Sequence, residues 1–203
     1  MLSEGLDKAT MRRVAQSLDT GPASLYVYIA NTAELHSAVL DELIGTLIVS
    51  SSGSWSERLE RLLDEYRELL FTYPGLAKSA LAIRPSGPHS LIFIDSLLGL
   101  LLEGGMESAR AAWAVDLLML YVTANAAEHS VPAASDIEAP VDRESTWTTL
   151  STAIGNADPA VAPRVAAHGP ALLGGTPAQR WTWAIGTLIA GAAIVPVPPA
   201  AKA

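Results

Sequence analysis

The sequence predicts an all-α protein. Apolar residues recur at intervals of three and four through most of the 203-residue chain, as they do on the buried face of a helix. Clusters of Pro and Gly separate these segments, and no stretch shows the alternation of apolar and polar residues that is typical of a strand. The first two predicted helices are short and joined by a tight turn, so we expect the fold to begin with a helix-turn-helix.

The first predicted helix follows Thr10, whose side chain can cap its N-terminus. One apolar stripe, at positions i, i+3, i+4 and i+7, is formed by Met11, Val14, Ala15 and Leu18. The turn at residues 19–22 ends this helix, because Gly21 tolerates a left-handed backbone and Pro22 can start a helix but cannot continue one.

The second predicted helix points Leu25 and Ile29 toward the first and leaves a polar and aromatic face outside. Two helices joined by a glycine-containing turn are the minimum that can place a helix in the major groove of DNA. A plainer alternative is that the tyrosines are core aromatics and that the serine only caps its helix. The groups that this geometry offers to DNA are the Gly21 backbone and the side chains of Ser24, Tyr26, Val27 and Tyr28.

In these residues the chain resembles the TetR family of bacterial transcriptional regulators. The resemblance implies a helix-turn-helix DNA-binding domain over residues 1–47 and a helical ligand-binding and dimerisation domain over residues 48–203. It further implies a homodimeric repressor that a small apolar or amphipathic effector releases from double-stranded operator DNA. The resemblance extends over residues 5–43 and is carried by Leu6, residues 10–15, residues 21–26, Ala30 with Asn31, and Glu34 with Leu35.

The resemblance also implies roles for single residues. Arg12 matches a position that can pair with a guanine edge, although an arginine there could equally be a solvated surface residue. Tyr28 matches a position that often touches bases, and Val27 could pack on a thymine methyl group. Thr32 stands where the family commonly has a Lys that holds a phosphate, so its hydroxyl and the helix dipole would have to serve instead. Contacts to phosphate or sugar are implied for Thr10, Ser24 and Tyr26.

The charge balance is unfavourable for DNA binding. The formal net charge is −8, and residues 1–50 hold three basic residues against six acidic ones, whereas affinity for nucleic acid comes largely from Lys and Arg. Members of the resembling family begin with a further helix that covers the first two, and here only residues 1–6 precede them. Each aliphatic side chain left uncovered forfeits about 1.5–3 kcal/mol. We therefore expect a longer native form with an additional N-terminal helix.

The helical pattern continues to the C-terminus. A connecting helix is predicted from Thr32, acting as its N-cap, to about Val49, and the next helix begins at Trp55 or Ser56. The nearly ideal stripe of that next helix is Leu59, Leu62, Leu63, Tyr66, Leu69, Leu70 and Tyr73. Further helices are predicted at about residues 76–83, 89–103, 107–128, 145–154, 159–167 and 177–195, with a mobile loop over 131–143 and another loop over 169–176.

The last predicted helix is suited to self-association, because small residues let helices approach closely. The resemblance makes the helix at 107–128 its partner in a four-helix dimer interface. The alternative is that the last helix is simply buried within one subunit. Its apolar stripe is Trp181, Ile185, Leu188, Ile189 and Ala192, and its small residues are Gly186, Ala190, Gly191 and Ala193.

Candidate ligand-binding residues lie in the middle of the chain, where aromatic and polar groups could line an apolar cavity. Asp116 and Asn125 interrupt an otherwise apolar helix, and a buried polar group needs a partner that a ligand could supply. The aromatic members could instead be ordinary core residues. The full set is Tyr66, Tyr73, Trp113, Asp116, Met119, Asn125 and Trp147.

Other classes of function find little support. The chain has no cysteine and its four histidines lack metal-ligand spacing, so we expect no metal site. There is no nucleophile elbow or phosphate-binding glycine loop, so we expect no catalytic residues and no cofactor. The longest apolar runs are too short to cross a bilayer and no secretory signal is evident, so we expect a cytoplasmic protein without a membrane partner. The alternative function is a helical ligand-binding dimer that has lost DNA binding, and a small helical enzyme is more distant.

Overall fold

The computed structural model describes residues 6–83, 85–129 and 143–199. Every regular element in these ranges is a helix, which confirms the predicted all-α class. The chain divides into two compact units, residues 1–137 with 188–203, and residues 138–187. The predicted domain boundary near residue 47 falls inside the first unit and stays a prediction.

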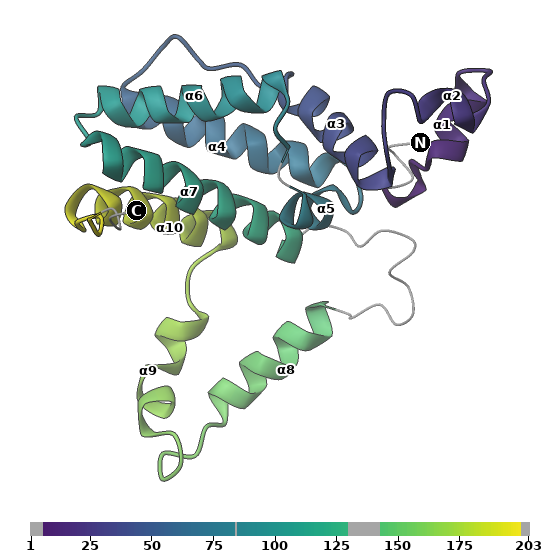
Figure 1. The fold of residues 1–203 in the computed structure, drawn as a ribbon. Helices are drawn as coiled ribbons and strands as arrows, with labels where there is room; N and C mark the ends of the chain where they lie inside the picture. Colours follow the sequence, from purple (N-terminus) through teal and green to yellow (C-terminus); the bar gives the residue numbers. More distant parts are fainter. Residues whose placement is uncertain (1–5, 84, 130–142, 200–203) are drawn as a thin grey trace. The chain divides into compact units, whose positions relative to one another are not determined.

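The first unit opens with the expected helix-turn-helix, formed by α1 (Met11–Ser17) and α2 (Pro22–Leu25) after a short 3-10 turn (Figure 1). Thr10 caps α1 by accepting a hydrogen bond from the Arg13 N–H at 3.3 Å, as predicted. The prediction for the turn was wrong in one respect. The left-handed residue is Asp19, with φ of 50°, whereas Gly21 has φ of −81° and serves as the extended N-cap of α2. Aspartate tolerates this conformation better than most residues.

The apolar stripe of α1 is only partly buried. Met11 and Ala15 are buried and Val14 is half-buried, but Leu18 is 62% exposed where α1 ends. Among the described residues, α2 is the main helix packed against α1, which leaves this end of the stripe in solvent. Leu18 therefore belongs to the predicted apolar stripe but is left uncovered at its end.

The connecting helix α3 (Thr32–Ile44) differs from the prediction at both ends. Its N-cap is Asn31 rather than Thr32, because the Asn31 side chain accepts from the Glu34 N–H at 2.9 Å. The Glu34 carboxylate in turn accepts from the Ala30 N–H at 2.6 Å. The helix ends at Ile44, not near Val49, and the Thr46 hydroxyl satisfies the Leu43 carbonyl at 2.7 Å.

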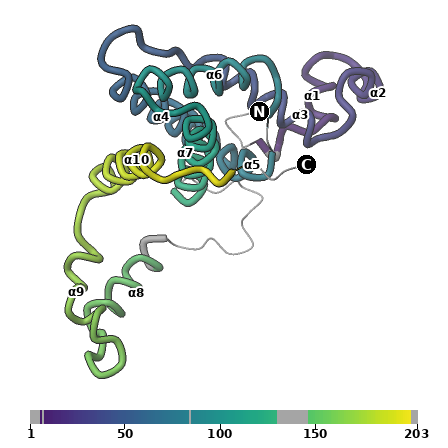
Figure 2. Tube along the Cα trace, turned by 60° about the vertical axis from the view of Figure 1, so that its left-hand side comes forward, coloured from purple at the N-terminus to yellow at the C-terminus, as the bar shows by residue number. Residues whose placement is uncertain are grey.

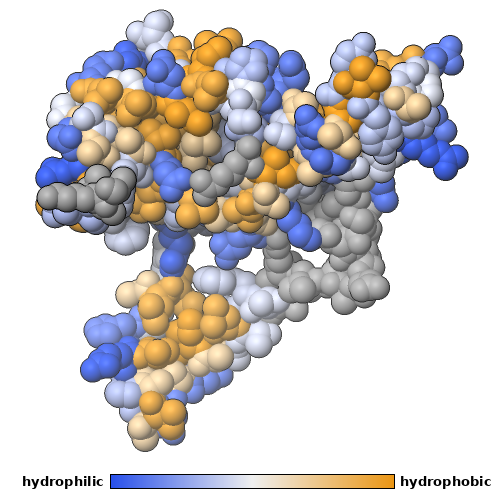
Figure 3. Space-filling model, in the orientation of Figure 1, coloured by the Kyte–Doolittle hydropathy of each residue, from blue (hydrophilic) through white to orange (hydrophobic). Residues whose placement is uncertain are grey.

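The core of the first unit is built by α4 (Trp55–Thr72), α5 (Leu76–Ala82), α6 (Pro88–Glu103) and α7 (Ser108–His129). The first three pack against α7 (Figure 2). The predicted stripe of α4 is largely confirmed, since five of its seven members are buried and Leu69 and Tyr73 are half-buried. Apolar side chains also reach the surface over this unit (Figure 3). Fully buried partners on the other helices include Leu76, Leu97, Leu101, Leu118 and Val122.

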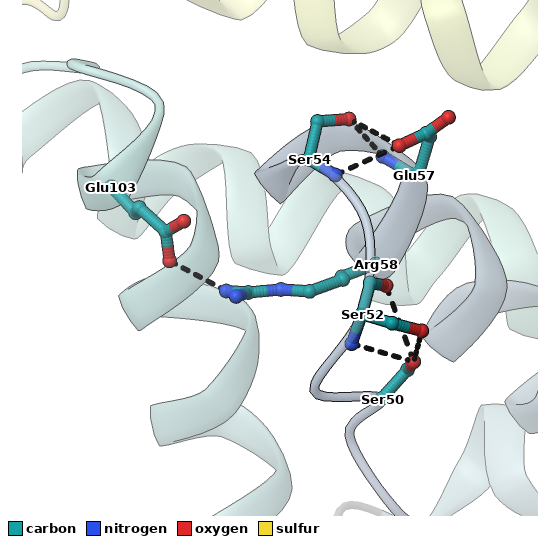
Figure 4. Close-up of polar contacts among 6 residues, drawn as sticks. All are labelled: Ser50, Ser52, Ser54, Glu57, Arg58 and Glu103. Carbon is teal, nitrogen blue, oxygen red and sulfur yellow. Dashed lines mark hydrogen bonds and ion pairs between the residues drawn. The ribbon is translucent and has the colours of Figure 1, made fainter.

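The start of α4 is fixed by a network of polar contacts (Figure 4). Ser54 and Glu57 form a capping box in which each side chain accepts a hydrogen bond from the other residue's N–H. Arg58 reaches across to Glu103 at the end of α6 at 2.5 Å. Gly104 follows there, and a Cβ added to it would lie 2.5 Å from the Trp55 ring. The first turn of α4 is thereby joined to the last turn of α6.

The second unit contains α8 (Arg143–Gly155), α9 (Pro163–Leu173) and the first part of α10 (Pro177–Ile194). The predicted loop over 131–143 lies almost entirely outside the described residues. The prediction for α9 was wrong, since it begins four residues later and continues through Pro170. At the end of the longer helix, the Arg180 guanidinium donates to the Leu172 carbonyl at 2.6 Å and to the Gly174 carbonyl at 2.7 Å.

Helix α10 carries the predicted stripe. Trp181, Ile185 and Ile189 are buried, whereas Trp183 is 73% exposed and Gly186 faces open space. No helix among the described residues is long and apolar enough to cross a membrane.

Candidate functional site

The candidate DNA-reading surface consists of α2 and the turn that follows it. The N–H groups of Tyr28 and Ile29 both donate to the Leu25 carbonyl at 2.9 Å, so the chain continues in a helical turn beyond the end of α2. Leu25 and Ile29 are half-buried and anchor this turn. Three successive large side chains are held outward as a result: Tyr26 is 56%, Val27 78% and Tyr28 81% exposed.

The other predicted DNA-binding residues are also accessible. Gly21 and Ser24 are exposed at the start of α2, and a Cβ added to Gly21 would meet no atom within 4 Å. Arg12 is exposed on α1, and Thr32 is exposed in the first turn of α3. The Thr10 hydroxyl oxygen accepts the capping bond of α1, so its hydrogen can still be donated. All eight predicted DNA-binding residues are therefore accessible to a binding partner, and their contacts with DNA stay predictions.

The candidate ligand site is a cavity of about 280 Å³ in the first unit. Its walls come from α4, α5, α6 and α7 and from the segment between α5 and α6. Tyr66, Asp116 and Met119, three of the seven predicted ligand-binding residues, line it. Among the described lining residues, Asp116 is the one charged side chain. The cavity is lined by Tyr66, Ala80, Leu81, Ile83, Pro85, Ile94, Ala112, Val115, Asp116, Met119, Leu120 and Thr123.

The remaining predicted ligand residues lie elsewhere. Tyr73 is half-buried just after α4, and Asn125 is half-buried near the end of α7. Trp113 is 58% exposed on α7, and Trp147 is exposed on α8 in the second unit. None of these four lines the cavity, and their roles in ligand binding stay predictions.

A buried hydroxyl pair lies within the cavity lining. The Tyr66 side chain is 3% exposed, its ring centroid is 5.0 Å from that of Phe93, and its Oη is 3.2 Å from Thr123 Oγ1. Burial raises the pKa of Tyr66, against a smaller opposing effect of the Thr123 hydrogen bond, so the phenol is neutral at physiological pH. One hydrogen bond between two hydroxyls uses one of their two hydrogens. The second can be donated to an oxygen atom of a ligand.

Sequence reasoning missed the contribution of α5 and the segment after it. Ala80, Leu81, Ile83 and Pro85 form one wall of the cavity. They belong to a short helix and a Pro-containing turn, and their apolar character alone does not separate a cavity wall from a packed core. Their role follows from the packing of α5 against α7.

Comparisons with known proteins agree with this architecture. Residues 50–158 match the family model of the tetracyclin repressor-like C-terminal domain. The chain is 42% identical to the transcription regulator SCO7704 of Streptomyces coelicolor, whose structure it matches with a TM-score of 0.77 over 96% of this chain and 89% of that one. It is 28% identical to apo ActR of the same organism, with a TM-score of 0.78 over 94% of this chain and 88% of that one.

A curated relative is the HTH-type transcriptional repressor DrrR1 of Streptomyces coeruleorubidus, 28% identical over 123 residues. That match covers 59% of this chain and 46% of the relative, so the chain spans about half the length of this curated protein. The family model covers the helical core that holds the cavity, and the structural matches extend over nearly the whole chain. The chain belongs to the TetR family of transcriptional regulators.

Proposed function

We propose that the protein is a ligand-responsive, DNA-binding transcriptional repressor. The observation that carries this proposal is the run of Tyr26, Val27 and Tyr28, which a helical turn after α2 holds outward in solvent. Large side chains at successive exposed positions indicate a surface that meets a partner. Their place at the end of a helix-turn-helix makes the major groove of operator DNA that partner.

Within this proposal, Tyr28 and Arg12 contact base edges, and Val27 packs on a thymine methyl group. The Gly21 N–H and the hydroxyls of Thr10, Ser24, Tyr26 and Thr32 contact the backbone and set the register. Few cations support these contacts, so affinity depends on shape and base contacts more than in a strongly basic protein.

The effector is proposed to occupy the cavity of about 280 Å³. Structures of the related ActR have been solved in complex with actinorhodin and with (S)-DNPA. In this chain the apolar lining and the Tyr66–Thr123 hydroxyl pair favour a compact, mainly apolar molecule that carries an oxygen acceptor. The cavity is slightly smaller than the usual size range for ligand pockets, about 300–1,000 Å³. We therefore expect a compact compound to be a better probe than a large one, and (S)-DNPA is the first compound to test because the related ActR binds it.

The working form is proposed to be a cytoplasmic homodimer without catalytic activity. Trp113 and Leu120 on α7 and Trp183 on α10 are large, apolar and more than half exposed. On α10 itself, Gly186 and Ala190 leave the helix thin enough for close approach of a second copy. Paired α7 and α10 helices would set the two reading surfaces about 34–36 Å apart, one turn of DNA.

The dimer interface is tested with Ala190→Arg, which adds bulk and charge to the exposed face of α10. Thr72→Arg, at an exposed position on α4, is the matched control. Size-exclusion chromatography with light scattering should show a dimer for the control and a monomer for Ala190→Arg. A dimer in both variants contradicts the proposed interface.

The DNA-binding function is tested by selecting duplexes from a random library with the purified protein. We expect enrichment of a two-fold symmetric sequence whose half-sites are one helical turn or a multiple of it apart. Failure to enrich any sequence, together with retained binding of (S)-DNPA, would instead support the ligand-binding dimer that does not bind DNA.

A further inference from the structure

A buried carboxylate joins the connecting helix to the start of α6. Asp41, on α3, is 6% exposed. It accepts hydrogen bonds from the Ser90 N–H at 2.8 Å, the Ser90 hydroxyl at 2.5 Å and the His89 N–H at 3.4 Å. Burial alone would raise the pKa of Asp41, but the hydrogen bonds of Ser90 and His89 outweigh it and lower the pKa. The carboxylate is therefore ionised and caps the N-terminus of α6 from another helix.

Two glycines make this close approach possible. A Cβ added to Gly87, the N-cap of α6, would overlap the Asp41 carboxylate. A Cβ added to Gly45, at the end of α3, would lie 2.7 Å from the His89 ring. The His89 ring also places its Nδ1 3.4 Å from Asp41 Oδ2. We call Asp41, Gly87, His89 and Ser90 the α3–α6 junction.

Along the chain, short connections lead from the α3–α6 junction to the cavity and to the DNA-reading surface. On one side, Ile83 and Pro85 line the cavity and lead within a few residues to Gly87. On the other side, α3 begins directly after Asn31, three residues beyond Tyr28. Asp41 lies nine residues after Thr32, a distance of about 13–14 Å along a helix that rises 1.5 Å per residue. One rigid helix therefore links the junction to the end of the reading segment.

We propose that Asp41 is a positioning residue that transmits occupancy of the cavity to the DNA-reading surface. A ligand that displaces Ile83 and Pro85 moves the start of α6, and the charge-assisted hydrogen bonds to Asp41 oblige α3 to follow. Without these bonds, α3 and α6 are joined only by their remaining packing, so the start of α6 can shift more freely relative to α3. The assignment of the two ends as ligand site and DNA surface rests on the proposed function, but the mechanical coupling itself does not.

The coupling can be tested without any ligand or DNA. Ala80→Phe, on the α5 wall of the cavity, introduces an aromatic ring that stands in for an occupant. Hydrogen–deuterium exchange with mass spectrometry then follows peptides that cover residues 20–47. We expect Ala80→Phe to change exchange in these peptides by about fivefold or more, the lower end of typical allosteric coupling. In an Asp41→Asn background the same change should have less than half that effect.

Matched variants separate coupling from simple loss of stability. Ala38→Gln changes an exposed position on α3, and Ser96→Ala removes a half-buried serine hydroxyl of α6 that donates to the Ile92 carbonyl of the same helix. Both should leave the response to Ala80→Phe intact. Ser90→Ala removes one of the three bonds to Asp41 and should weaken the response partly, so it serves if Asp41→Asn does not fold. The response is the difference between filled and unfilled cavity within one background, which a uniform loss of stability leaves unchanged.

An equal response to Ala80→Phe with and without the Asp41 bonds overturns the proposal, and so does the absence of any response in the otherwise unmodified chain. Operator affinity provides the second readout, where Ala80→Phe should weaken binding in the wild-type background and much less with Asp41→Asn. If no DNA is bound at all, the proposed function fails, while the exchange experiment still decides the role of Asp41.

Discussion

The Tyr66–Thr123 pair allows a quantitative test of the cavity's construction. Tyr66→Phe keeps the ring packed against Phe93 and removes only the hydroxyl that lies 3.2 Å from Thr123. A buried hydrogen bond between neutral groups contributes about 0.5–1.5 kcal/mol net, and removal of one partner leaves the other unsatisfied. We expect Tyr66→Phe to lower the free energy of unfolding by about 1 kcal/mol, and Thr123→Val to do the same.

The double variant Tyr66→Phe with Thr123→Val shows whether the two hydroxyls interact or whether each contributes to stability independently. When both partners become apolar, neither group is left unsatisfied, and such replacements can be nearly neutral. The double variant should therefore be destabilised by less than the sum of the single changes, with a coupling of about 1 kcal/mol. Urea unfolding monitored by circular dichroism gives all three values. Strictly additive losses would show that the two hydroxyls do not interact, and would refute the geometry assigned to the cavity.

The same residue predicts the alkaline behaviour of the protein. The pKa of Tyr66 is raised in the folded state by burial, so its stabilising effect is fully present below the unfolded tyrosine pKa, near 10. It is lost as the pH rises from there toward the folded pKa, because the unfolded chain releases the phenolic proton first. Tyr121, whose pKa is also raised by burial and by Glu128, contributes in the same direction. The loss of stability above pH 10 should be shallower in Tyr66→Phe, and an unchanged slope would contradict the assignment.

Three further predictions follow from single sites. Tyr28→Ala, at an 81% exposed position, should change folding stability by less than about 0.5 kcal/mol. In an anisotropy titration it should weaken operator binding by about 1–3 kcal/mol per half-site. Operator binding equal to that of the unmodified protein would exclude a base contact by Tyr28. Asn31→Ala removes the cap of α3 and should cost about 0.5–2 kcal/mol in urea unfolding, with Thr32→Ala as the neutral control. The stability that Asp41 provides through its lowered pKa should be present above about pH 4 and lost as the pH falls further, and an acid titration of Asp41→Asn should lack this part of the loss.

Periodicity predicted the long amphipathic elements well because one physical effect dominates there. In α4 the spacing of leucines and tyrosines at three and four residues determines which face is buried, whereas the Ser54–Glu57 capping box at its start was not predicted. The same reasoning identified the buried stripe of α10. Tyr66, Asp116 and Met119, which were chosen as ligand candidates, line one cavity, but Asp116 is exposed rather than buried as its choice assumed.

Local features with several competing solutions were predicted less well. Both Asn31 and Thr32 can cap a helix, and the choice depends on the reciprocal bond from Glu34. Both Asp19 and Gly21 tolerate a left-handed backbone, and the turn places Asp19 there. Helix α9 continues through Pro170, and the carbonyls at its end accept hydrogen bonds from Arg180, which comes from the next helix. In each case the residue spacing in the sequence does not distinguish between the possible caps, turn residues or helix ends.

Contacts between distant segments could not be predicted from the sequence. Asp41 and Ser90 are 49 positions apart, and nothing in either neighbourhood signals that one caps the helix of the other. No sequence signal identifies the α5 wall of the cavity either, because Ala80 and Leu81 are ordinary residues of a short helix. Only the packing of α3, α5, α6 and α7 brings these groups together.

The most direct test of the account is fluorescence anisotropy with the DNA that flanks the protein's own gene, measured at several salt concentrations with unrelated DNA as competitor. The account predicts saturable, sequence-specific binding that survives the competitor and weakens only moderately with salt, because few cations face the phosphates. It also predicts that a compact, mainly apolar ligand that fills the cavity releases the DNA. Binding that is equally weak for both DNAs and falls steeply with salt would contradict the account, since it would leave the exposed Tyr26–Tyr28 surface without a reading function.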